Sequence, residues 1–124
     1  MLINIHQGGY ATQGAGEPDL RTIYGDSLAN QAGGTGYPNG TVNRHYFPKL
    51  STGTTTAMNR GSWYDATTQM IGIQSPVNVG FTSEFDTATR ELTVNVELYY
   101  TLNSPSTTNY LNVAFLENHV RVSV

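Results

Sequence analysis

The sequence of 124 residues contains no cysteine and a single lysine, Lys49. Without cysteine, the chain cannot form a disulfide bond, a thiolate nucleophile or a cysteine-ligated metal site. Only 12% of its residues are charged, whereas an average soluble domain has about 25%. Threonine, asparagine, serine and glycine must therefore supply most of the polar surface. Such a composition is typical of turn-rich and strand-rich extracytoplasmic proteins.

The charge and hydropathy patterns argue against two classes of partner. The formal net charge is −3 and no basic stripe is present, so we expect no nucleic-acid binding. No apolar run approaches the roughly 18 residues that a membrane-spanning helix needs.

The chain begins directly in a strand-like run, Leu2–His6, which we interpret as the start of an internal fragment. Any export signal or lipid anchor is then expected upstream, and the membrane would be reached only through that anchor.

No set of residues predicts catalysis, and we expect neither an enzyme nor a bound metal or cofactor. The three histidines lack the spacing of metal ligands: they are His6, His45 and His119. Turns and solvent exposure explain four acidic residues in and around the expected hairpin: they are Glu84, Asp86, Glu91 and Glu97. Neither a Gly-x-Ser-x-Gly elbow nor a phosphate-binding loop is present.

The first half predicts short strands and helices separated by glycine-rich loops. Leu2–His6 reads as a buried strand, residues 7–16 as a loop, and Glu17–Asp19 as a helix start that Pro18 favours. Apolar residues at helical spacing continue that helix to a stop at Gly33–Gly34: they are Leu20, Ile23, Tyr24 and Leu28. A turn over 36–40, a strand over 41–45 and a loop over 48–57 complete this part.

A second helix is expected after a capping box formed by Ser62 and Asp65. Its buried face would carry four residues: Trp63, Ala66, Met70 and Ile73. Beyond Pro76 the apolar residues alternate with a period of two. This predicts strands over 77–85 and 92–102 joined by a hairpin turn over 86–91, a further turn over 103–109, and one more strand or a bent pair over 111–117 and 120–124.

The chain therefore belongs to the α+β class by its sequence, with a mixed region over residues 1–75 and an antiparallel β-meander over 76–124. The second region contains too few strands for a complete β-sandwich, which usually has about seven. We interpret it as a partial sandwich. Its apolar face must be covered by the helical half, by sequence outside this chain, or by another copy in a homo-oligomer.

Several runs resemble the outer-membrane-protein-28-related lipoproteins of Bacteroidetes. They are Ile5–Ala11, Asp19–Thr22, Gly36–Arg44, Arg90–Val94, and Tyr110–Ala114 followed by Glu117–Asn118. The resemblance covers essentially the whole chain. It implies a partial thioredoxin-like region over 1–75, followed by β-strands, in a lipid-anchored protein of the outer membrane and cell surface. Members of the family are described as receptors or adhesins without a settled activity.

The resemblance also implies a special role for the turn at Tyr37–Pro38. Thioredoxin-like folds place a cis-proline at the matching position, where the turn presents its backbone to an extended peptide. The sequence leaves open whether this bond is cis and whether the turn binds anything. A cysteine pair would lie upstream of Leu2, so a second hypothesis is the substrate-facing part of a thiol–disulfide protein.

Exposed aromatic residues are the best candidates for contact with a partner, because rigid rings with a polar tip are favoured at interfaces. We select six candidate contact residues: His6, Tyr10, Tyr37, Pro38, Tyr46 and Tyr99. A protein or peptide partner is the leading expectation, in an adhesion or receptor-like module. A third hypothesis, carbohydrate binding through the tyrosines and Trp63, ranks below it.

Overall fold

The computed structural model describes residues 2–117 and residue 120. The described chain combines helices and strands, so the α+β class is confirmed. It divides into two compact units. The first contains the described residues up to Gly72 together with those from Ala114 on, and the second is Ile73–Val113.

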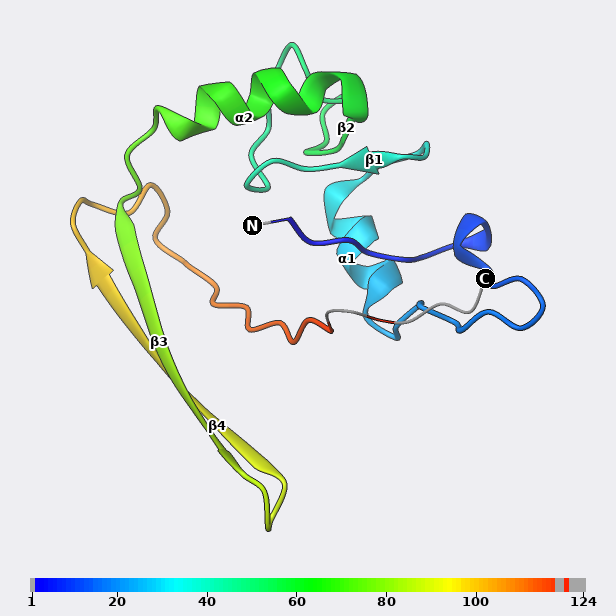
Figure 1. Cartoon of the computed structure of the whole chain (residues 1–124). Helices are drawn as coiled ribbons and strands as arrows, with labels where there is room; N and C mark the ends of the chain where they lie inside the picture. The colour runs from blue at the N-terminus through cyan, green and yellow to red at the C-terminus, as the bar shows by residue number, and fades with distance from the viewer. Residues whose placement is uncertain (1, 118–119, 121–124) are drawn as a thin grey trace. The chain divides into compact units, whose positions relative to one another are not determined.

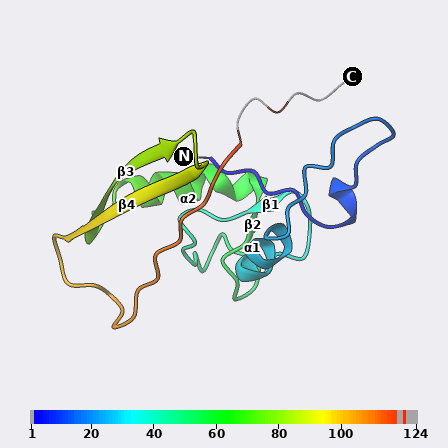
Figure 2. The same ribbon diagram turned by 90° about the horizontal axis from the view of Figure 1, so that it is seen from below.

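The first unit is built around a small core between one helix and a two-stranded sheet (Figures 1 and 2). Strand β1 (Asn39–Gly40) pairs antiparallel with β2 (Met58–Asn59), and a 3-10 turn η2 (Arg60–Ser62) leads into helix α2 (Trp63–Ile71). Phe47, Met58 and Ala66 are buried in this core. Four partly buried residues pack against them: Val42, Leu50, Trp63 and Met70.

The predicted face of α2 is confirmed for Trp63, Ala66 and Met70, because the spacing of three and four residues brings them to one side. Ile73 lies beyond the helix end and is 57% exposed, so its assignment to that face was wrong. The capping box was also wrong, since Ser62 makes no side-chain cap hydrogen bond. Asn59 caps the preceding 3-10 turn instead, accepting a hydrogen bond from the backbone N–H of Gly61 at 3.0 Å.

Helix α1 (Gly25–Ala32) is much shorter than predicted. Residues 17–24 are not helical because local hydrogen bonds turn the chain there. The carboxylate of Asp19 accepts from the backbone N–H of Arg21 at 3.0 Å and also binds its guanidinium, which competes with helix formation. The predicted stop is confirmed: Gly33 adopts a left-handed conformation and its N–H bonds to the carbonyls of Ala29 and Asn30.

Two predicted strands of the first unit are absent. Residues 2–6 pair with no strand among the described residues, although a short 3-10 helix η1 (Gly9–Ala11) follows them. The expected strand over 41–45 is a turn, because Asn43 and Arg44 both have positive φ angles, 51° and 49°. Such left-handed residues cannot continue a strand. Pairing occurs just before the turn instead, in β1. The loop predicted over 48–57 contains no helix or strand.

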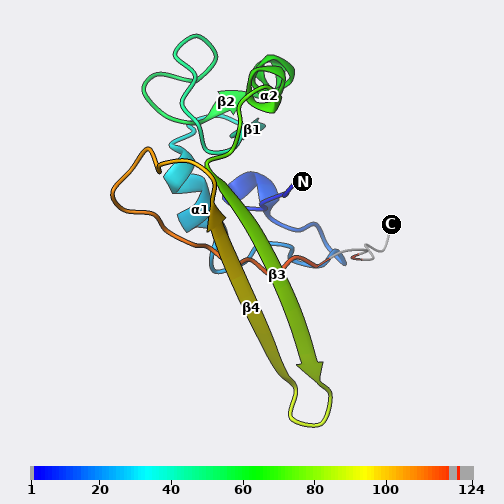
Figure 3. The same cartoon turned by 90° about the vertical axis from the view of Figure 1, so that its left-hand side faces the viewer.

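The second unit is dominated by a long hairpin, β3 (Val77–Asp86) and β4 (Glu91–Tyr100), which confirms the two strands and their turn (Figure 3). Val77 lies opposite Tyr100 and Asp86 opposite Glu91. The next predicted strand, 111–117, is wrong, since these residues are in no strand. Residues 121–124, also predicted to be in a strand, lie outside the described residues. The sheet therefore has two strands where a meander of three or four was expected.

Candidate functional site

A shallow groove of about 610 Å³ lies in the first unit, between the segment His6–Ala11 and the segment Thr35–Pro38. It contains four of the six predicted contact residues: His6, Tyr10, Tyr37 and Pro38. The remaining lining residues were not singled out from the sequence: Gln7, Ala11, Thr35 and Gly36. The fold thus brings together two segments that lie almost 30 residues apart in the sequence.

The segment His6–Ala11 forms the first wall of the groove and the segment Thr35–Pro38 forms the second. Helix α1 sets the spacing of these two walls. At its first residue, Gly25 is buried against the backbone of the first wall, where an added Cβ atom would lie 2.8 Å from the carbonyl oxygen of His6 and 3.5 Å from Cβ of Gln7. At its other end, Gly33 terminates the helix and the second wall begins two residues later. The carbonyl of Ala32 accepts from the backbone N–H of Ala57 at 3.1 Å, which attaches this end of α1 to the loop before β2.

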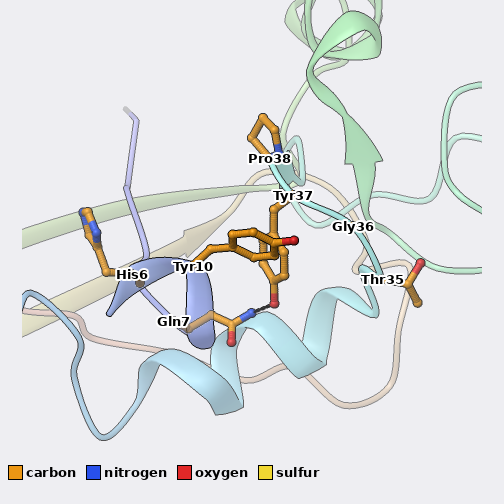
Figure 4. A pocket seen from close by; sticks show the side chains of 8 residues that line it. His6, Gln7, Tyr10, Thr35, Gly36, Tyr37 and Pro38 are labelled. Carbon is orange, nitrogen blue, oxygen red and sulfur yellow. Dashed lines mark hydrogen bonds between the residues drawn. The ribbon is translucent and has the colours of Figure 1, made fainter. Parts of the chain in front are cut away.

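Side chains also join the two walls directly (Figure 4). The amide Nε2 of Gln7 donates a hydrogen bond to the hydroxyl of Tyr37. The rings of Tyr10 and Tyr37 pack in a tilted arrangement, with centroids 5.7 Å apart and an interplanar angle of 56°. Tilted and edge-to-face aromatic pairs are favourable because the positive ring edge meets the negative face. Figure 4 shows His6 and Thr35 on opposite sides of this aromatic pair.

The groove offers contact surface and hydrogen-bonding groups. Tyr10 is 90% exposed and Tyr37 is 52% exposed, so both rings remain available to a partner. Tyr37 lies next to a cis peptide bond to Pro38. Its backbone N–H and carbonyl make no backbone hydrogen bond within the described part of the chain. Apart from His6, the lining residues carry no ionisable group other than the two tyrosine hydroxyls.

Two predicted contact residues lie elsewhere. Tyr46 is 40% exposed, precedes the buried Phe47 and does not line the groove. Tyr99 belongs to the second unit, where it is 70% exposed on β4 opposite Asn78. Neither residue joins the four that form the groove.

Trp63 is partly buried against the core. Its ring packs on β1, where a Cβ atom added to Gly40 would lie 3.2 Å from the ring carbon Cζ2. Its indole Nε1 donates to the carbonyl of Met58 at 3.2 Å. These contacts hold the partly buried ring against the core, where its indole N–H finds an acceptor. A carbohydrate site would therefore depend mainly on the more exposed tyrosines.

The histidines and acidic residues of the described part of the chain are spread along it. No group of three or more His, Asp and Glu side chains gathers there, and His119 lies outside them. The imidazole of His45 packs edge-on against Phe47, with centroids 4.7 Å apart. No described helix is long and apolar enough to cross a membrane.

An ion pair shapes the loop that follows the first wall. The guanidinium of Arg21 meets the carboxylate of Asp19 at 2.7 Å and also donates to Gln13 at 3.2 Å. The hydrogen bonds from Arg21 lower the pKa of Asp19 to about 2 because they favour its charged form. The arrangement tethers residues 12–13 to 19–21 on the protein surface.

Comparison with models of protein families, with curated proteins and with solved structures gives no match for this chain. The assignment of a function therefore depends on the groove and on the resemblance seen in the sequence.

Proposed function

We propose that this chain is a non-enzymatic interaction module of a bacterial outer-membrane surface lipoprotein, and that the groove between Tyr10 and Tyr37 binds an extended segment of a protein partner. The observation that carries the proposal is the meeting of four candidate contact residues from two distant segments in one groove. The finer fold implied by the family resemblance, a thioredoxin-like part followed by part of a β-sandwich, belongs to the same proposal.

The chemistry of the groove favours a peptide over other ligands. An extended peptide needs hydrogen bonds to its backbone and pockets for alternate side chains. The backbone N–H and carbonyl of Tyr37, which pair with no other backbone group among the described residues, supply the first. The exposed rings of Tyr10 and Tyr37 supply apolar contact. Because the groove lacks carboxylates and cationic Lys or Arg side chains, the segment it fits best is uncharged and carries a proline or aromatic residue.

A peptide-array experiment tests this binding. Ten-residue peptides with a central proline or aromatic residue, and scrambled versions, would be probed with the wild-type chain and with the variants Tyr10→Ala, Tyr37→Ala and Tyr64→Ala. Tyr64 is the matched control, since it is 80% exposed on α2 and does not line the groove. Loss of an aromatic hot-spot residue costs an interface about 2 kcal/mol or more, which weakens binding more than tenfold. We expect this for Tyr10→Ala and Tyr37→Ala and no change for Tyr64→Ala. Equal binding by all three variants would contradict the proposal.

The location is tested separately on cells that produce the parent lipoprotein. Protease treatment of intact cells should remove the epitope of this chain from the cell surface, whereas a periplasmic marker should survive. Protection of the epitope until the outer membrane is permeabilised would overturn the surface assignment and leave the peptide-binding result unaffected.

A further inference from the structure

The hairpin β3–β4 has one apolar face and one polar face. Since side chains alternate along a strand, the register assigns five cross-strand rows to the apolar face: Val77–Tyr100, Val79–Leu98, Phe81–Val96, Ser83–Val94 and Phe85–Leu92. No charged residue occurs among these ten. The opposite face carries the acidic residues of the hairpin: Glu84, Asp86, Glu91 and Glu97.

Within the second unit, no helix or further strand covers the apolar face. Phe81 is 73% exposed, and Phe85 and Tyr100 are 56% and 44% exposed. Because a Phe or Tyr side chain presents about 150–250 Å², these three rings expose on the order of 350 Å². With the exposed parts of Val79, Leu92 and Leu98 the face reaches about 600 Å², the upper end of the largest patch found on typical monomers. Two-stranded hairpins are also marginally stable alone in water.

We propose that a second copy of this chain covers this face, so that two hairpins stack face to face as a four-stranded sandwich about a two-fold axis. The apolar area of about 600 Å² per copy approaches the roughly 800 Å² that each partner buries in a stable interface. This proposal concerns the second unit and does not depend on the peptide-binding groove.

The size of the side chains selects one orientation of the two copies. One possible two-fold axis lies between the two sheets and runs at right angles to the strands. It reverses the order of the rows in the partner, so the smallest row, Ser83–Val94, lies over the larger row Val79–Leu98 of the partner. The alternative axis, parallel to the strands, stacks the smallest row on itself and leaves a void, which costs free energy. The perpendicular axis runs through the central row. It therefore brings Phe81 close to Phe81 and Val96 close to Val96 of the other copy.

Charge favours stacking of faces over pairing of edges. In an edge-to-edge dimer, the acidic faces of the two hairpins would form one continuous surface with the carboxylates of both copies. This arrangement is unfavourable because like charges on adjacent strands are destabilising. In the face-to-face dimer, the two acidic faces point away from each other. Both arrangements satisfy symmetry, but only the stacked one removes the apolar face from water.

The absence of cysteine in the wild-type chain makes a cross-linking test direct. Val96→Cys places one thiol near the proposed axis, and Asn95→Cys, its neighbour on the polar face, is the matched control. Stacked sheets lie about 10 Å apart, so a short bis-maleimide can join the two introduced thiols across the interface. We expect rapid formation of covalent dimer for Val96→Cys and little for Asn95→Cys. Similar yields at both positions indicate edge pairing and overturn the proposal.

Analytical ultracentrifugation of the chain over a concentration series provides the second measurement. The wild-type chain is expected to dimerise, and Phe81→Ser is expected to weaken dimerisation at least tenfold because it removes the aromatic residue at the axis. Thr82→Ser, on the opposite face, should leave the dissociation constant unchanged. Phe81 is exposed in the single chain, so its loss should not unfold the hairpin, and circular dichroism checks this. A wild-type chain that remains monomeric at millimolar concentration overturns the proposal.

Discussion

The carbonyl oxygen of His6 lies against the α-carbon of Gly25, so closely that a Cβ atom on residue 25 would be 2.8 Å from that oxygen. This approach joins the first wall of the groove to the start of α1. A helical glycine would otherwise be unfavourable by about 1 kcal/mol relative to alanine. The close approach explains why glycine is present at this position.

Gly25→Ala is expected to destabilise the first unit and displace the His6–Gln7 wall. Overpacking of this kind typically costs about 1–3 kcal/mol, which exceeds the gain in helix propensity. Chemical denaturation followed by circular dichroism measures the change in the free energy of unfolding. Gly72→Ala is the matched control, because its Cβ atom would have no neighbour closer than 3.8 Å. Equal stability of the two variants would show that the wall moves freely.

Met58→Ala should produce a large loss of stability. Met58 is fully buried beside Phe47 and Ala66, and truncation of such a side chain leaves a cavity that costs about 2–5 kcal/mol. Ile71→Ala, at the end of α2, removes a side chain that is 81% exposed and should change the free energy of unfolding by less than about 0.5 kcal/mol. A small effect of Met58→Ala in urea denaturation would contradict the assigned core.

The ion pair of Asp19 and Arg21 predicts a pH dependence with a defined sign. The folded pKa of Asp19, about 2, lies below its ordinary value of 3.8. Its contribution to stability is therefore present above pH 3.8 and disappears as the pH falls through about 2. Carbon-13 NMR titration of the Asp19 carboxyl group measures this pKa. Arg21→Gln should raise it toward 3.8, whereas Arg44→Gln, which alters a cation outside this ion pair, should leave it unchanged.

Asp86 is expected to hold the hairpin turn through its carboxylate. It accepts hydrogen bonds from the backbone N–H groups of Ala88 at 2.8 Å and Thr89 at 3.2 Å, which lowers its pKa. Asp86→Ala should therefore accelerate amide hydrogen exchange at residues 88 and 89. Asp86→Asn keeps an acceptor and should restore part of the protection. Unchanged exchange in Asp86→Ala would show that the turn forms without this side chain.

The elements predicted correctly from the sequence are those whose own residues determine them. Helix α2 follows from its apolar spacing, and β3 and β4 follow from the alternation of apolar residues along each strand. The first helix was predicted too long because the helical spacing of Leu20 and Ile23 was given more weight than the turn-forming residues Asp19 and Arg21. Asp19 two residues before Arg21 allows a side-chain turn, and this hydrogen bond prevails over the helix.

The groove could be predicted only in part. The aromatic residues and Pro38 were selected by their chemistry, but their meeting depends on α1 and on the close approach at Gly25, which no local pattern encodes. Gln7 was missed, although its position before Gly8, which has a positive φ of 68°, places it at a sharp change of chain direction. Tyr46 was selected by the same rule as Tyr10, but it does not line the groove. Its neighbour Phe47 packs into the core.

The packing of Trp63 also decides what intrinsic fluorescence can reveal about this chain. It is the single tryptophan, and its indole lies between Gly40 and the carbonyl of Met58. Its emission spectrum therefore follows the opening of the β1–β2–α2 core. A melting curve recorded by tryptophan emission and one recorded by far-ultraviolet circular dichroism should differ whenever the two units unfold independently.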